Sequence, residues 1–219
     1  MSQSDFLTFI SKCSQEIVDE FEVRTKGQHN NPLWVSARTA LITASNFHEI
    51  KTKKDSTKSE NIICAVHWGI KQEPIAKKRY KAYMKLKKKQ NVIVEDMGLV
   101  LYPHCSYFDA SPDGLVKFVT HKYLLKVKSP FKWSHCTILE ACKDKTFCCY
   151  IDDTNTIQLK KSHEYYTQVQ GQMGVCQMER CDFVIYTIKD FLVIPIQSDN
   201  SFWESLLIKL EKFYIEELF

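Results

Sequence analysis

A short acidic turn followed by two apolar segments constrains this chain more than any other feature. Residues 115–119 and 123–127 have the composition of strands, and the three residues between them suit a hairpin turn. Asp113 precedes the first segment, and the second carries Lys126 and continues to Lys128. Side chains two apart on a strand share a face, so we expect both lysines to point where Asp113 points. An acidic turn that faces a lysine-bearing strand is the layout of a metal-dependent phosphodiesterase.

The remaining apolar patterns predict helices on either side of a run of strands. We expect an α/β fold: a single domain with a mixed central β-sheet flanked by helices. Its parts would be an N-terminal helical part at about 1–90, a catalytic core at about 91–197 and a C-terminal helix at about 199–217. The expected helices are 4–21 (capped by Ser4-Asp5), 61–89 (broken or bent near Gly69 and Pro74), 133–142, 162–176 and one capped by Asp199. Further strands are expected at 92–94, 99–102, 183–188 and 192–196, with an irregular polar segment at 146–159.

Composition excludes several classes of protein. The 219 residues are 44% hydrophobic and 26% charged, as in an ordinary globular domain. No apolar run approaches the roughly 18 residues of a membrane span, and the N-terminus lacks a signal peptide, so we expect an intracellular protein with no membrane partner. The nine cysteines are scattered without a Cys-x-x-Cys pair, which favours reduced thiols over disulfides or zinc. Residues 71–89 are strongly basic and suit either a polyanion or a solvated helix face.

Five blocks of residues together resemble one known family. The hairpin, with Ala110-Ser-Pro-Asp-Gly-Leu-Val116 and Leu124-Leu-Lys-Val-Lys-Ser-Pro-Phe131, is similar to the nuclease core of the YqaJ-type viral recombinases, to which phage lambda exonuclease belongs. That family lies in the PD-(D/E)XK nuclease superfamily. The other blocks match in the family's order: Trp34 with Arg38, Thr43-Ala-Ser-Asn-Phe47, Gly69 with Glu73, and Tyr165-Tyr-Thr-Gln-Val-Gln-Gly-Gln-Met173.

The resemblance implies a metal-dependent catalytic centre. Asp113 would bind one or two Mg²⁺ or Mn²⁺ ions directly, since hard ions prefer carboxylate oxygen. The backbone carbonyl of Val127 would be a further ligand, and the position of Lys126 would hold a glutamate ligand in the family. Glu73 would complete the acidic cluster. Lys128 would orient the attacking water and stabilise the developing charge.

The same resemblance implies a pocket for the 5′-phosphate of DNA. Arg38, Ser45 and Ser111 match the positions that form it, and a guanidinium with nearby hydroxyls is well suited to phosphate. Each serine could equally be a helix cap. Gln168 would reach the catalytic centre, whereas Gln170, two residues on, would point to another side of the helix and is the weaker candidate for DNA binding.

Lys126 departs from the family pattern, which is Glu-x-Lys at this strand. Two unit charges 4 Å apart interact by about 4 kcal/mol at an effective dielectric of 20, so exchanging −1 for +1 beside a divalent ion changes the energy by on the order of 16 kcal/mol. A protonated Lys126 therefore cannot take the place of the glutamate ligand. Either its side chain swings away, or another carboxylate such as Asp109 replaces it, or the site binds metal poorly. A substitution that disables cleavage is a further alternative.

These observations give one main functional hypothesis and two rivals. The main one is a metal-dependent exonuclease that degrades duplex DNA from a 5′-phosphorylated end, 5′ to 3′, in recombination or DNA processing. The second is a catalytically impaired or inactive DNA-end-binding protein, because of Lys126. A third is an endonuclease of the same superfamily. The resemblance also implies that the chain forms a homotrimeric ring and that a single-strand annealing protein is its partner.

Overall fold

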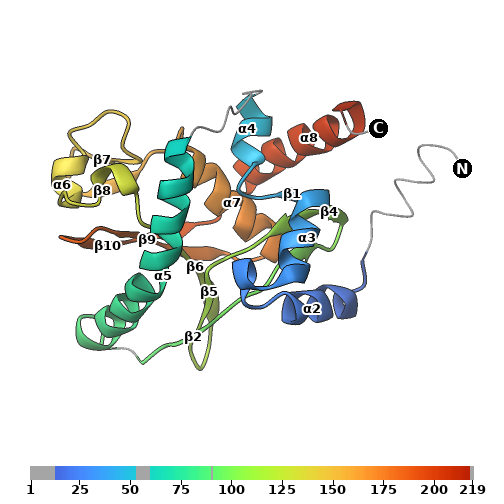
Figure 1. Ribbon diagram of the computed structural model, residues 1–219, viewed down its shortest axis with the longest axis horizontal. Helices are drawn as coiled ribbons and strands as arrows, with labels where there is room; N and C mark the ends of the chain where they lie inside the picture. Colours follow the sequence, from blue (N-terminus) through green and yellow to red (C-terminus); the bar gives the residue numbers. More distant parts are fainter. Residues whose placement is uncertain (1–12, 53–59, 90, 218–219) are drawn as a thin grey trace, which may run out of the picture.

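The computed structural model describes residues 13–52, 60–89 and 91–217 of the chain (Figure 1). Its centre is a five-stranded sheet in the order β10-β9-β6-β5-β2, in which β6 and β9 are parallel and the other neighbours antiparallel. The mixed sheet and its flanking helices confirm the expected fold class. The five strands are β2 (Ile93–Glu95), β5 (Gly114–Lys117), β6 (Lys122–Lys128), β9 (Arg180–Tyr186) and β10 (Phe191–Gln197).

Two long helices cover opposite faces of this sheet. Alternate residues of β6 point to opposite sides, so Leu124 packs with α7 (Glu164–Cys176) and Leu125 with α5 (Glu60–Leu86). α5 continues through Pro74, so the helix is not broken there. Each face buries a continuous set of apolar side chains, and this burial accounts for most of the helices' stability.

Two further sheets complete the strand arrangement. A three-stranded sheet, β1-β4-β3, joins β1 (Ile42–Thr43), β4 (Cys105–Ala110) and β3 (Val100–Tyr102). The predicted strands near 92–94 and 99–102 therefore exist but belong to different sheets. β7 (Cys149–Ile151) and β8 (Ile157–Leu159) pair antiparallel. The prediction that 146–159 is irregular was wrong, because β7 and β8 form a small hairpin within this segment.

The N-terminal helices pack beside the three-stranded sheet. α2 (Gln15–Arg24) begins after Ser14, whose hydroxyl accepts a hydrogen bond from the Ile17 amide. The predicted helix over 4–21 is thus not continuous, and its proposed Ser4-Asp5 cap lies outside the described residues. The next elements are η1 (Gln28–Asn30), α3 (Pro32–Ala40) and α4 (Phe47–Thr52).

The remaining helices differ in how well the sequence predicted them. The segment 133–142 was expected to be one helix but contains the end of η2 (Phe131–Trp133) and the single turn α6 (Ile138–Ala141). Thr137 and Glu140 form a capping box that starts α6 at this point. The final helix is α8 (Asn200–Glu217), and the Asp199 carboxylate accepts from the Phe202 amide as expected of a cap. The division into parts at about 90 and 197 stays a prediction.

No helix within residues 13–52, 60–89 and 91–217 is both long enough and apolar enough to cross a membrane.

Candidate functional site

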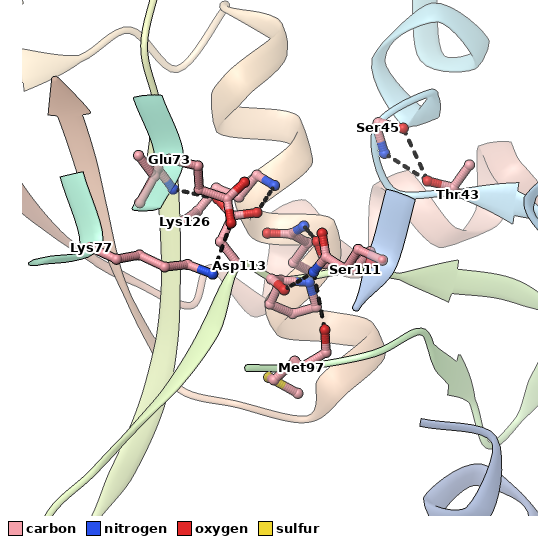
Figure 2. Close-up of polar contacts among 12 residues, drawn as sticks. Thr43, Ser45, Glu73, Lys77, Met97, Ser111, Asp113 and Lys126 are labelled. Atoms are coloured by element: carbon pink, nitrogen blue, oxygen red, sulfur yellow. Dashed lines mark hydrogen bonds and ion pairs between the residues drawn. The ribbon is translucent and has the colours of Figure 1, made fainter. Parts of the chain in front are cut away.

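A groove of about 720 Å³ lies where α5, β6 and α7 approach α3. It collects side chains from segments that are far apart in the sequence. Figure 2 shows polar contacts of several of these side chains, among them Ser45, Glu73, Ser111, Asp113 and Lys126. Every predicted site residue except Gln170 lines this groove: Arg38, Ser45, Glu73, Ser111, Asp113, Lys126, Val127, Lys128 and Gln168.

Asp113 and Lys126 form a buried ion pair on the floor of the groove. The Lys126 ammonium donates to Asp113 Oδ1 at 2.6 Å, and the Val127 amide donates to Oδ2 at 2.6 Å. Only 3% of Asp113 and 9% of Lys126 is exposed. The sequence left open that the Lys126 side chain swings away from the site. The structure excludes this alternative, because Lys126 contacts Asp113 directly. Its ammonium binds the carboxylate on which metal binding would depend.

Glu73 lies beside this pair but has its own cation. Lys77, one turn along α5, approaches the Glu73 carboxylate to 2.8 Å and Asp96 to 3.1 Å. Burial and the nearby negative charge of Asp113 raise the pKa of Glu73. Burial alone would lower the pKa of Lys77, but the interactions with Glu73, Asp113 and Asp96 together outweigh it and the pKa is raised. The expected acidic cluster is therefore neutralised by two lysines (Figure 2).

Lys128 points into the same groove from the end of β6. Its ammonium lies 4.3 Å from the centre of the Tyr165 ring, on the first turn of α7. Burial, reinforced by the positive charge of Lys126, lowers the pKa of Lys128 to about 8. None of the ion pairs among the described residues includes Lys128. The prediction that both lysines share a face with Asp113 is confirmed, because all three line the groove.

The predicted phosphate pocket forms the other part of the groove. Arg38 Nη2 donates to Ser45 Oγ at 3.1 Å, and Thr43 and Ser45 are 3.0 Å apart through their hydroxyls. The Arg38 guanidinium stacks over the Trp34 ring, 4.4 Å from its centre. Trp34 in turn donates to the Ser111 hydroxyl at 2.7 Å. Arg38 is therefore held in place on two sides. Burial lowers the pKa of Arg38, although the attraction of Asp109 opposes this shift.

Four residues of the glutamine-rich helix α7 line the groove, Glu164, Tyr165, Gln168 and Gln172, and only Gln168 was among the predicted site residues. Gln168 lines the groove as expected. Gln170 does not, because its amide group donates to the Gln197 carbonyl and accepts from the Asp199 amide, which fixes the start of α8. Gln172 was missed: it donates to the Ser111 carbonyl at 3.1 Å and lines the groove. Its position four residues after Gln168, on the same helix face, was the signal that could have found it.

Asp109 does not replace the missing glutamate. It lies on β4, fully buried and outside the groove lining, and neither carboxylate oxygen has a hydrogen-bond partner among the described residues. Burial raises its pKa to about 7 despite the attraction of Arg38. This replacement hypothesis is therefore wrong.

The donor set at Asp113 does not fit a divalent metal ion as it stands. Both oxygens of Asp113 are engaged, Glu73 is paired with Lys77, and an ammonium stands where a third carboxylate would be needed. Within the part of the chain that the structure describes, no three His, Cys, Asp or Glu side chains are grouped so as to hold a metal. The predicted Mg²⁺ or Mn²⁺ therefore has no set of free ligands here.

Comparison with known proteins identifies the family. The sequence profile described as the YqaJ-like viral recombinase domain matches residues 50–179, which is more than half of the chain. The chain belongs to this family. Within the family match lie the hairpin, Glu73 and the glutamine-rich helix, whereas Arg38 and Ser45 precede it.

Relatives of this YqaJ-like chain include viral and bacterial proteins. It is 34% identical over 96 residues to the alkaline nuclease of Human herpesvirus 7 (strain JI), an alignment that covers 42% of this chain and 19% of the viral protein. Among solved structures, LHK-Exo of Laribacter hongkongensis in complex with dAMP has a TM-score of 0.61 at 25% identity, covering 84% of this chain and 90% of LHK-Exo. A SOX–DNA complex has a TM-score of 0.62, covering 91% of this chain and 70% of SOX; at 14% identity this shows the fold alone.

Proposed function

We propose that this YqaJ-like chain recognises 5′-phosphorylated ends of double-stranded DNA through an exonuclease-type groove. One observation supports the proposal: a single groove joins Arg38 and Ser45, which we propose to bind phosphate, to Asp113 and Lys128, which the family resemblance places in the nuclease centre. Relatives named alkaline nuclease and alkaline exonuclease support a nuclease-type activity on DNA. Structures of SOX with DNA and with RNA support a nucleic-acid ligand.

The Arg38 end of the groove is prepared for a terminal phosphate. The guanidinium is stacked on Trp34 and bonded to Ser45, so little side-chain entropy remains to be lost on binding. A phosphate dianion could accept from Arg38 and from the hydroxyl of Ser45 together. The Ser111 hydroxyl already accepts from Trp34, so we assign Ser111 to holding that ring in place rather than to contacting phosphate directly.

Two forms of this function differ in whether cleavage follows binding. The first is metal-dependent hydrolysis from the 5′ end, with Mg²⁺ or Mn²⁺ as the source of Lewis acidity when bound. It is supported by the nuclease relatives and by Lys128 and Gln168 in the groove. It requires Asp113 to release Lys126, because the present donor set does not fit a metal.

The second form is binding of DNA ends with impaired or absent cleavage. The 2.6 Å contact between Lys126 and Asp113 favours it, since the contact neutralises the metal-binding carboxylate and leaves the Arg38 pocket intact. Breaking such a buried pair would leave an uncompensated charge, at a typical cost of about 3–5 kcal/mol. Of the two forms, the geometry favours end binding.

A cleavage assay separates the two forms. Linear duplex DNA with a 5′-phosphate is incubated with wild-type protein and with Lys126→Glu, each with Mg²⁺ and then with Mn²⁺. We expect wild type to leave the DNA nearly intact and to bind it in a salt-sensitive way, more tightly than 5′-hydroxyl DNA. Rapid digestion by wild type would establish the first form, and equal affinity for both kinds of end would contradict the proposal itself. Nicking of closed circular DNA would indicate an endonuclease.

The assembly state belongs to the same proposal. A homotrimeric ring around DNA and a single-strand annealing partner are what the family resemblance implies. Sedimentation that shows a monomer at high protein concentration would exclude the ring.

A further inference from the structure

The contact between Lys126 and Asp113 has a charge balance that equals that of a loaded metal site. Glutamate with a divalent cation carries a net charge of +1, and a lysine ammonium alone carries the same +1. The groove lining carries three carboxylates, Glu73, Asp113 and Glu164, and three Lys/Arg side chains, Arg38, Lys126 and Lys128, and Lys77 pairs with Glu73 beside it. The Lys126 side chain therefore replaces the glutamate and its ion together, without changing the net charge that faces a bound phosphate.

The Lys126 ammonium also occupies one oxygen of Asp113, the carboxylate that would bind an ion. The ammonium lies 2.6 Å from this oxygen, while the other is fixed by the Val127 amide. Both groups are almost fully buried, so the interaction is weakly screened by solvent. Figure 2 shows Lys126 reaching toward Asp113, with Glu73 beside them.

Lys128 supplies a second cation, which forms no ion pair within the described residues although Glu164 lines the same groove. It lies two residues along the same strand face, and its ammonium packs against the Tyr165 ring at 4.3 Å. A cation that forms no ion pair in a groove is suited to bind an anion. The buried ammonium has lost part of its hydration, and a bound phosphate can replace the lost water. Lys126 and Lys128 thus present two adjacent positive groups toward the groove.

We propose that Lys126 is a built-in cation that takes the place of the catalytic metal, and that with Lys128 it forms a metal-independent binding site for a DNA phosphodiester. The inference rests on the proposed function: the DNA is the strand whose 5′-phosphate lies at Arg38. An ammonium neutralises a phosphate but offers no coordination position to a water molecule, so it binds without generating a metal-bound nucleophile. The site holds a DNA end and does not need Mg²⁺ to do so.

Binding measured with and without metal tests this inference. The probe is a 5′-phosphorylated blunt duplex with a fluorescent label at its far end, followed by anisotropy in EDTA, in Mg²⁺ and in Ca²⁺ at matched ionic strength. Wild-type affinity should differ by less than about threefold among the three conditions. Lys126→Glu should bind at least tenfold more weakly in EDTA and recover in Ca²⁺, because its carboxylate restores the ion's ligand. A gain of tenfold or more for wild type on adding metal would overturn the inference.

Matched controls separate the local effect from general electrostatics and from misfolding. Lys189→Glu makes the same charge change on an exposed turn outside the groove and should leave binding within about twofold. If Lys126→Glu fails to fold, as judged by circular dichroism, Lys126→Gln replaces it and should lose affinity in EDTA as well. Equal binding of wild type and the folded variant in EDTA would contradict the inference.

A metal-binding measurement gives a second readout that does not involve DNA. Free Mn²⁺ has a strong paramagnetic resonance signal that bound Mn²⁺ lacks. Wild type should leave the signal unchanged, whereas Lys126→Glu should reduce it by one ion or more per chain. Tight Mn²⁺ binding by wild type that Asp113→Asn abolishes would overturn the inference, even if the preference for 5′-phosphorylated ends holds. Loss of that preference would instead overturn the proposed function.

Discussion

The buried carboxylate of Asp109 predicts an unusual dependence of stability on pH. It is completely inaccessible to solvent, and neither oxygen has a hydrogen-bond partner in the described structure. Burial raises its pKa from 3.8 to about 7. In the unfolded chain the carboxylate ionises near pH 4, whereas in the folded chain it keeps its proton to near pH 7. The folded state therefore binds more protons in this window, and the free energy of unfolding falls as pH rises through it.

The shift sets the size of the effect. About three pKa units at roughly 1.4 kcal/mol per unit correspond to about 4 kcal/mol lost between pH 4 and pH 8. Over the more accessible range from pH 5 to pH 8, the expected loss is about 3 kcal/mol. Asp109→Asn has no ionisable group at this site and should not show this loss. Its amide also lacks partners, so a constant cost of about 1–3 kcal/mol is expected at every pH.

Urea unfolding of wild type and Asp109→Asn at pH 5, 6, 7 and 8 measures the effect. The difference in unfolding free energy between the two proteins should change by about 3 kcal/mol across this range, in favour of the variant at high pH. Asp153→Asn, which removes an exposed carboxylate on a turn, is the matched control and should follow wild type. Parallel profiles for wild type and Asp109→Asn would refute the assignment of a raised pKa to Asp109.

Three further predictions concern the groove and its support. Gly171→Ala would place a methyl group 2.5 Å from the Phe47 ring, so a net loss of about 1–2 kcal/mol in unfolding free energy is expected despite better helix propensity; unchanged stability would show that the ring moves freely. Tyr80→Phe removes the 2.6 Å hydrogen bond to buried Asp182 and should cost about 1–3 kcal/mol in urea unfolding, with unchanged stability counting against this contact. Arg38→Ala should reduce the affinity ratio between 5′-phosphate and 5′-hydroxyl DNA at least tenfold, and an unchanged ratio would place the phosphate elsewhere.

Local sequence was enough to predict the elements that carry the site. The apolar runs around Asp113 predicted β5 and β6, and the apolar stripe of α7 predicted a helix, while the direction of Gln168 came from the family resemblance. In both cases the signal is the spacing of side chains within one element. Residues two apart on a strand or four apart on a helix share a face wherever the element is placed.

The contacts between distant segments could not be predicted in this way. β1 is only two residues long and pairs in parallel with β4. The two strands are far apart in the sequence, so no local pattern of residues predicts that they pair. The same applies to the ion pair of Lys77 with Asp96, and to the pairing of Tyr80 with Asp182. Each depends on how α5 is placed on the sheet. The sequence showed that Lys126 was anomalous, but only the structure shows that it binds Asp113.

The short pairing of β1 with β4 gives the groove a fixed length. Thr43 pairs with Asp109, and the Ala44 amide donates to the Asp109 carbonyl at 2.9 Å, so main-chain bonds tie the turn that holds Ser45 to the strand that leads to Asp113. In the proposed DNA complex, backbone geometry then sets the distance from the terminal phosphate at Arg38 to the phosphodiester at Lys126. In that complex, side-chain substitutions in the groove would change how tightly a DNA end is held, but not which phosphodiester faces Lys126.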